Sequence, residues 1–294
     1  ENPSTDVARY RAGDLDMTSY ALPPEQFAKL QKELPGEVFT TRTLATYSYE
    51  LNNKKAPFDN VNVRKALNLS LDRNVITDKV LGQGQTPTYV FTPTYIEEGH
   101  LIQQPAYSKE PMAQRNEEAI KLLEEAGYSK ANPLKFSILY NTNENHKKVA
   151  IAAASMWKAN TKGLIDVKLE NQEWKTYIDS RRAGRYDAAR AGWNADYNQA
   201  TTFGNYFLSN SSNNTAKYAN PEYDKAIAES YVATDAEGRA KAYAKAEEIL
   251  AKDFGIVPIF NYVNPRLVKP YVKGYSGKDP QDHIYLRNLY IIKH

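Results

Sequence analysis

The sequence predicts an α/β fold, and two patterns carry that prediction. Between residues 133 and 193, three segments of β-forming residues are separated by segments with helical spacing, and such alternation is typical of α/β proteins. Two further stretches, 38–51 and 255–275, are rich in β-branched and aromatic residues and predict long strands. With 294 residues, the chain is long enough for one large domain or two ordinary ones.

The first forty residues predict two short helices before the first strand. The first helix follows Ser4 or Thr5, either of which can cap it, and ends at Gly13. The second helix lies within Pro23 to Gly36. The strand Val38 to Leu51 follows, because its residues alternate and favour β-structure.

Helices and strands then follow each other through the middle of the chain. A long amphipathic helix is predicted over 59–81, followed by a loop at 82–95 that is rich in Gly, Pro and Thr. A second amphipathic helix over 114–128 is closed by Gly127. The alternating part that comes next is predicted as strand 133–141, helix 146–160, strand 165–174, helix 175–184 and strand 186–193.

Two more helices are predicted after residue 220. Asn220 is expected to cap the first, with Pro221 in its first turn. Thr234 and Glu237 have the spacing of a capping box ahead of a helix over 238–253. The chain then returns to strand.

Composition excludes several classes of protein. Apolar residues make up 41% and charged residues 25%, as in ordinary globular proteins, and the net charge of +3 is not gathered into basic blocks, so we expect no nucleic-acid partner. The absence of cysteine rules out disulfides, thiolate metal sites and cysteine nucleophiles. The longest apolar run, 149–157, is far shorter than the roughly 20 residues that cross a bilayer. The 22 tyrosines favour recognition surfaces.

The segment ARAGWNADYN, residues 189–198, is unusual for a strand. In extended chain alternate residues share a face, which predicts one face with Arg190, Gly192, Asn194 and Asp196 and another with Ala191, Trp193, Ala195 and Tyr197. The first face would present a cation and an anion with bare backbone between them, a complement to an extended, zwitterionic ligand. A purely structural role, with the aromatic residues in the core and the charges at a solvated edge, stays open.

Candidate catalytic groups are sparse. No histidine stands at metal-ligand spacing from another histidine or a carboxylate; the four are His100, His146, His283 and His294. The GQGQ segment at 82–85 lacks the pattern of a phosphate-binding loop. We therefore expect no metal and no cofactor. Two acid pairs leave a glycosidase-like alternative open: Glu173 with Asp179, and Asp187 with Asp196.

Five segments carry a resemblance to a known family, in whose members they stand in the same order. They are PFDNVNVRKALNLSLDRNVI (57–76), RNEEAIKLLEEAGY (115–128), NQEWKTYIDSRRAGRYDAARAGWNADYNQATTF (171–203), YANPEYDKAIAES (218–230) and RLVKPYVKGYSGKDPQDHIYLRNLYIIKH (266–294). The chain resembles, over essentially its whole length, the periplasmic solute-binding proteins for peptides, nickel and opines, and in particular the oligopeptide receptors of ABC importers.

The resemblance implies a periplasmic-binding-protein type II-like fold with a complete second lobe and part of the first lobe. Residues 1–46 and 263–294 would form the partial first lobe, and residues 47–262 the second ligand-binding lobe, with two chain crossings as the hinge. Family members are longer. We therefore expect the signal peptide, the first part of the first lobe and a small extra domain to be absent from this sequence.

The resemblance also implies roles for individual residues. Asp196 would bind the α-ammonium of a peptide, while Arg190 and His146 would meet its C-terminal carboxylate. Side-chain pockets would be formed by Arg181, Trp174 and Trp193. Tyr262 and Asn141 also match positions that face the ligand, and the extended-strand interpretation of 189–198 adds Gly192 and Asn194 as peptide-binding residues.

Two departures from the family pattern lie near these residues. Close relatives have a Cys at the position of Asn194 and a partner Cys at that of Ala45, so we expect a local crosslink to be missing here. Relatives often have Pro in the turn that reads NQATTF at 198–203, and its rigidity is in question here.

The function implied is that of a receptor without catalytic activity. It would capture short oligopeptides in extended form in the periplasm and deliver them to an inner-membrane ABC permease. We expect a monomer whose partners are short peptides, the permease and the missing N-terminal part of the receptor. The alternatives are a murein-tripeptide receptor, a chaperone-like holder of unfolded chains and, from another class, a carbohydrate-active hydrolase.

Overall fold

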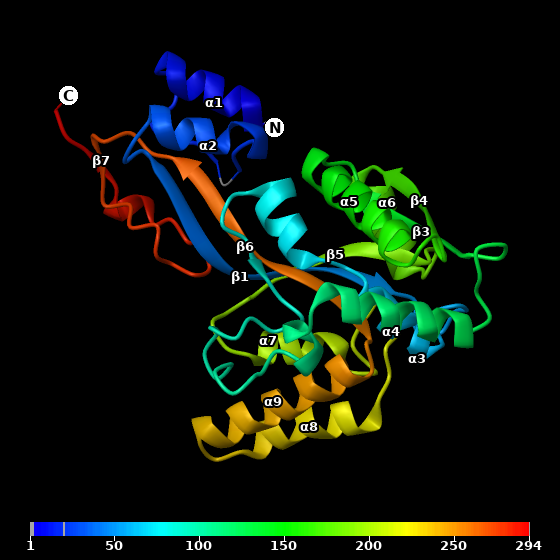
Figure 1. Cartoon of the computed structure of the whole chain (residues 1–294). Helices are drawn as coiled ribbons and strands as arrows, with labels where there is room; N and C mark the ends of the chain where they lie inside the picture. The colour runs from blue at the N-terminus through cyan, green and yellow to red at the C-terminus, as the bar shows by residue number, and fades with distance from the viewer. Residues whose placement is uncertain (1–2, 20, 294) are drawn as a thin grey trace.

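Two long antiparallel strands run through the centre of the molecule, and the other elements pack around them (Figure 1). A computed structural model describes residues 3–19 and 21–293, so residues 1, 2, 20 and 294 of the predicted first lobe lie outside the described residues. The strands are β1 (Val38–Leu51) and β6 (Ile256–Leu267), and the predicted bounds of the first are confirmed. The mixed α/β class predicted from the sequence is confirmed as well.

Six of the described strands form a mixed sheet in the order β2-β6-β1-β5-β3-β4, and the other two form a separate two-stranded sheet near the C-terminus. β1 is antiparallel to both of its neighbours, β5 and β6, while β3 is parallel to β4 and β5. The bounds of the four shorter strands are β2 (Thr86–Pro87), β3 (Leu134–Asn141), β4 (Ile165–Gln172) and β5 (Ala188–Asn194).

The helices flank the sheet in two groups that build two hydrophobic cores. The first core packs β1, β3 and β6 with α3 (Val61–Leu69), η1 (Val75–Leu81), α4 (Met112–Glu125) and α5 (Glu144–Asn160). The second is built around α7 (Thr201–Gly204), η3 (Asn205–Phe207), α8 (Pro221–Val232) and α9 (Ala236–Lys252). None of the helices in the described part of the chain has the length and apolar character required to cross a bilayer.

A third, smaller core lies at the other end of β1 and β6. Here α1 (Pro3–Ala12) and α2 (Pro24–Glu33) pack on Leu267 of β6. The C-terminal segment also lies at this end of the molecule (Figure 1). It contains β7 (Val272–Lys273), η4 (Leu286–Asn288) and β8 (Tyr290–Ile291).

The pairing of β1 with β6 is interrupted where the family resemblance implies the boundary between lobes. Arg42 pairs with Val263 and Thr46 with Asn261, so three residues of β1 face a single residue of β6. At this bulge the Leu44 amide donates to the carbonyl of Pro280 (2.7 Å) instead of to β6. The division into lobes stays a prediction, but a break in the ladder is where two strands can bend most easily.

The prediction of one continuous helix over 59–81 is wrong, because this segment forms two helices, α3 and η1. Asp72 accepts hydrogen bonds from the amides of Asn74 (3.0 Å) and Val75 (3.4 Å) and so starts a new helix. The turn also carries Arg73 into the core, where its guanidinium donates to the carbonyls of Thr88 (3.0 Å) and Pro258 (2.7 Å).

Three predicted helix starts are also corrected. Trp174, predicted at the end of a strand, begins α6 (Trp174–Arg182), and α1 begins at Pro3, so Ser4 and Thr5 lie inside it. The capping box at Thr234 is wrong, since Asp235 caps α9 by accepting from the Gly238 amide (2.7 Å). The cap of α8 by Asn220 is confirmed.

We expect Trp157→Ala to lower the free energy of unfolding by about 3–5 kcal/mol, because it empties a large part of the first core. The Trp157 side chain is fully buried, and its Nε1 donates to the carbonyl of Leu67 (2.9 Å). Trp174, 55% exposed, provides the matched control, and Trp174→Ala should change stability by no more than about 0.5 kcal/mol. Urea unfolding followed by circular dichroism tests this, and equal losses in both variants would contradict it.

Candidate functional site

A cavity of about 750 Å³ opens between the predicted lobes, within the size range of ligand pockets. Its walls come from both sides, with Thr43, Val263 and Gln281 on one side and α5, α6 and β5 on the other. The sequence-predicted site residues that line it are Asn141, His146, Trp174, Arg190, Gly192, Asn194 and Tyr262. Arg181, Trp193 and Asp196 lie outside its lining.

Strand β5 presents alternate residues to the cavity, as the sequence predicts. Arg190, Gly192 and Asn194 line it, and the pairing of Asn194 with Ala45 of β1 closes that end of the ladder. On its other edge β5 pairs with β3 only at Ala188 and Ala189. Within the described sheet, the cavity-facing part of β5 therefore has a strand neighbour along one edge only.

Arg190 is the dominant charge of the cavity. Its Nη2 donates to the hydroxyl of Tyr262 (2.6 Å), its Nη1 lies 3.5 Å from Oδ1 of Asn141, and its Nε has no partner among the described residues. No carboxylate of the described residues forms an ion pair with it, whereas Asp282 at the cavity wall is already paired with Arg266. The guanidinium is therefore a partly buried cation without a counterion.

Gly192 makes room for this arrangement. A Cβ at this position would lie 3.0 Å from Nη2 of Arg190 and 3.0 Å from the hydroxyl of Tyr262. The Arg190 side chain thus extends along its own strand and lies over Gly192.

The cavity has an aromatic wall beneath Arg190 that sequence analysis missed in part. Tyr47 and Phe260 stack with ring centroids 4.7 Å apart, and the ring of Tyr262 lies 5.2 Å from that of Phe260. The Arg190 guanidinium lies 5.2 Å from the centre of the Tyr47 ring, which is within cation–π range. Because alternate residues of a strand share a face, the sequence could have placed Tyr47 on the same face of the sheet as Tyr49.

His146 lies in the first turn of α5 and points into the cavity. Asn143 caps the helix by accepting from the amides of Asn145 (2.9 Å) and His146 (3.1 Å). Burial, reinforced by the nearby charge of Arg190, lowers the pKa of His146 to about 2. The ring is therefore neutral near pH 7, which leaves Arg190 as the cation that an anionic ligand would meet.

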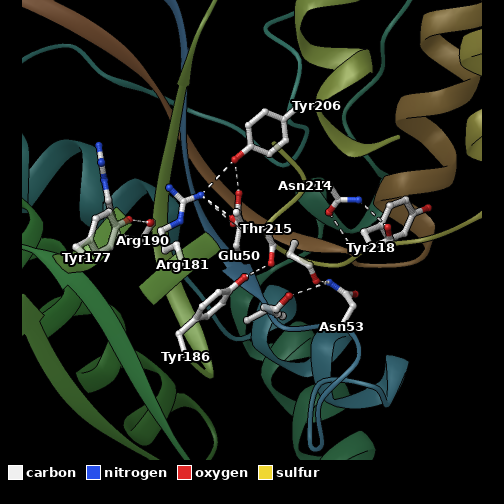
Figure 2. Close-up of polar contacts among 12 residues, drawn as sticks. Glu50, Asn53, Tyr177, Arg181, Tyr186, Arg190, Tyr206, Asn214, Thr215 and Tyr218 are labelled. Atoms are coloured by element: carbon white, nitrogen blue, oxygen red, sulfur yellow. Dashed lines mark hydrogen bonds and ion pairs between the residues drawn. The ribbon is translucent and has the colours of Figure 1, made fainter. Parts of the chain in front are cut away.

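Arg181 belongs to a buried network behind the cavity (Figure 2). Glu50 of β1, itself fully buried, pairs with Nη2 of Arg181 (2.9 Å) and accepts from the hydroxyl of Tyr206 (2.6 Å). Thr215 donates to the same carboxylate, and Arg181 donates to its hydroxyl (3.0 Å). Arg181 thus anchors α6 to the sheet, and a role in a side-chain pocket stays a prediction.

Trp193 and Asp196 lie beside the cavity. Trp193, on the opposite face of β5, packs against Tyr206 at 4.9 Å and donates from Nε1 to the carbonyl of Thr202 (2.9 Å). β5 ends at Asn194, so Asp196 follows in a loop, where it is exposed and accepts from the hydroxyl of Thr202 (3.3 Å). The face predicted to carry Arg190, Gly192, Asn194 and Asp196 therefore ends at Asn194 and does not include Asp196.

One member of each acid pair considered for glycoside hydrolysis has a structural role. Glu173 caps α6 by accepting from the amide of Lys175 (2.9 Å). Burial alone would raise the pKa of Asp187, but the bonds from Lys55 and Ser137 outweigh it and hold that pKa below its usual value. A general acid needs the opposite shift. The described residues contain no group of three or more potential metal ligands.

The low pKa of His146 predicts a pH-dependent stability. In the unfolded chain this histidine takes up a proton below about pH 6.5, but the folded chain does not, so the free energy of unfolding falls as pH decreases. We expect the melting temperature to fall more steeply from pH 7 to pH 5 in the wild type than in His146→Gln. Differential scanning calorimetry measures this. The neighbouring Asn145→Ala, with no titratable group, should keep a constant offset from wild type, and a constant offset in His146→Gln would refute the prediction.

Comparison with known proteins places this geometry in a family. Residues 1–215 match the family described as bacterial extracellular solute-binding proteins, family 5 Middle. The periplasmic oligopeptide-binding protein OppA of Haemophilus influenzae is 97% identical over the whole chain, which covers 54% of that relative. The periplasmic murein peptide-binding protein MppA of Escherichia coli is 44% identical over 99% of the chain and 53% of the relative.

The fold agrees with solved structures of such proteins. The crystal structure of Haemophilus influenzae OppA in complex with the peptide RPPGFSPFR superposes with a TM-score of 0.94 at 96% identity, over 100% of this chain and 57% of the other. The chain spans about half the length of the relatives that it matches. It belongs to family 5 of the bacterial extracellular solute-binding proteins.

Proposed function

We propose that this chain forms the larger part of the peptide site of a periplasmic receptor that serves an ABC importer. The receptor captures short oligopeptides in extended form between two lobes and delivers them to an inner-membrane permease, without catalysing a reaction. Residues beyond this chain, equivalent to the N-terminal part of the longer relatives, complete the first lobe. The receptor acts as a monomer.

The unpaired guanidinium of Arg190 is the observation that carries this proposal. A cation in a cavity wall costs desolvation energy that no carboxylate of the described residues offsets. A ligand carboxylate would offset it, through a charge-assisted and often bidentate hydrogen bond. The C-terminus of a short peptide provides such a group whatever its sequence.

The half-open edge of β5 supports binding of the peptide backbone. The pairing of β3 with β5 ends at Ala189 and Tyr177 occupies the carbonyl of Arg190, so the residues of β5 after Arg190 can accept an added strand on that side. Backbone groups of alternate residues point to the same edge, so a ligand strand can pair with several of them at once. Main-chain pairing of this kind tolerates varied peptide sequences.

The other predicted residues have supporting roles. Asp196, exposed beside the cavity, would bind the peptide ammonium once the lobes close, and His146 would add a second contact for the carboxylate of a peptide of different length. A carboxylate held between Arg190 and His146 would raise the pKa of the imidazole. Trp174 and Trp193 would bound the side-chain pockets together with Arg181.

Identity favours an oligopeptide receptor over a murein-peptide receptor. The chain is 97% identical to a protein named for oligopeptides and 44% identical to one named for murein peptides. The hydrolase alternative loses support from the solute-binding family and from the structural roles of Glu173 and Asp187.

Titration of peptides into the chain joined to the N-terminal segment of its longer relatives tests the proposal. We expect mixed tri-, tetra- and pentapeptides to bind, and C-terminal amidation or Arg190→Met to weaken binding by about 2 kcal/mol or more each, because either change removes one charge of a buried pair. The two losses should not add. Isothermal titration calorimetry measures them.

Arg182→Met, an exposed arginine at the end of α6, is the matched control and should bind normally. Asp196→Asn and N-acetylated peptides test the other terminus in the same way. Amidated and free peptides of equal affinity would exclude the role of Arg190. Tighter binding of a murein tripeptide than of every linear peptide, or sugar release from glycans, would favour the respective alternative.

The 294-residue chain alone should bind the same peptides far more weakly than the completed receptor. Part of the first lobe, and the main-chain partners that it would supply, lie outside these residues. Parallel calorimetry of the two proteins measures the difference. Full-strength, tripeptide-selective binding by the shorter protein would contradict this expectation.

A further inference from the structure

We propose that Tyr177 is a positioning residue for Arg190: its hydroxyl fixes the main chain of β5 at the residue that carries the carboxylate-binding guanidinium. The proposal rests on the function assigned above to Arg190. Tyr177 was not among the residues predicted from the sequence. It does not line the cavity, and its side chain is fully buried.

The Tyr177 hydroxyl acts where the pairing of β5 with β3 ends, while β1 still pairs with β5 on the other edge. The last pair between β3 and β5 is Leu139 with Ala189, and the next residue along β5 is Arg190. Tyr177 donates a hydrogen bond to the carbonyl oxygen of Arg190 (Figure 2). A side chain from α6 thus contacts the backbone at the first position that β3 no longer reaches.

Tyr177 is itself held firmly on both sides. Its ring packs in a small buried cluster with Leu139, Tyr186 and Ala189. One turn later on α6, Arg181 is tied to β1 through its ion pair with Glu50 (2.9 Å). The hydroxyl is therefore presented to β5 by a helix that is fixed to the sheet, which a flexible side chain on a loop could not do.

The guanidinium has little room to compensate for a shift of its backbone. It lies over Gly192, with only 3.0 Å between Nη2 and the position of a Cβ on that residue, and bonds to Tyr262 at 2.6 Å. Movement of the Arg190 main chain would lengthen this bond or change the direction in which the guanidinium meets a ligand. Tyr177 also lies against Trp174, with centroids 5.8 Å apart, and so links two cavity residues.

The experiment compares Tyr177→Phe with Tyr223→Phe in the completed receptor. Both substitutions remove a buried hydroxyl that donates to a main-chain carbonyl, that of Gly204 (2.7 Å) in the case of Tyr223, and both keep the ring. The readout is the ratio of dissociation constants for amidated and free-acid forms of one tripeptide. We expect Tyr177→Phe to reduce this ratio by about two- to tenfold, the value of one hydrogen bond, and Tyr223→Phe to leave it unchanged.

Both variants should lose a similar few degrees of melting temperature, so a selective loss of carboxylate discrimination separates positioning from general stability. An unchanged ratio in Tyr177→Phe, or equal reductions in both variants, would overturn the inference. If the wild type itself does not discriminate, the proposed function fails, and a crystal structure of Tyr177→Phe then decides the positioning role. A lengthened bond between Arg190 and Tyr262 supports it, and an unmoved Arg190 refutes it.

Discussion

The pairing of β1 with strands on both of its edges is the constraint on which the rest of the structure depends. β6 runs along one edge of β1 and β5 along the other. All residues of β1 from Thr43 to Leu51 are buried. Because successive side chains of a strand point to opposite faces, β1 contributes to cores on both sides of the sheet. Tyr47 and Glu50 then place an aromatic wall and a buried anion at fixed distances from β5.

Buried polar groups hold the helices to this sheet and to the loops around it. Glu50 binds Arg181 of α6, and the fully buried Arg73 uses backbone carbonyls of two distant segments in place of a carboxylate. Glu247 of α9 accepts from the amides of Phe91 (2.5 Å) and Thr92 (3.1 Å). Each group has the partners that offset its desolvation, and each fixes the register of an element that hydrophobic packing alone would leave free to slide.

Local patterns in the sequence were sufficient for the elements whose signals are local. The alternation of 38–51 predicted β1 without error, and the cap at Asn220 predicted the start of α8. The break after α3 could not be predicted, because it depends on carbonyls of Thr88 and Pro258 that only the fold brings to Arg73. At Thr234 two neighbouring residues could both cap, and local geometry favoured Asp235.

The candidate site shows the same limit. Alternation placed Arg190, Gly192 and Asn194 on one face of a strand, and the family resemblance added His146, Asn141 and Tyr262, which all line the cavity. The strand predicted over 186–193 already stopped short of Asp196, and the shared face could include Asp196 only if the chain stayed extended beyond that strand, whereas β5 ends at Asn194. Sequence could not show that Arg181 faces Glu50, because that contact joins a helix to a strand remote in the chain.

The two ends of the segment 47–262 lie side by side in the sheet. Residues 47–262 enter and leave through neighbouring strands, since Thr46 faces Asn261 and Tyr47 faces Phe260. The two ends of this long segment are thus only about one strand spacing apart, roughly 5 Å. A segment with adjacent ends can be inserted into, or exchanged between, host domains without stretching either chain. The region that contains Arg190 can therefore recombine as a single segment, with β5 and its supporting helices intact.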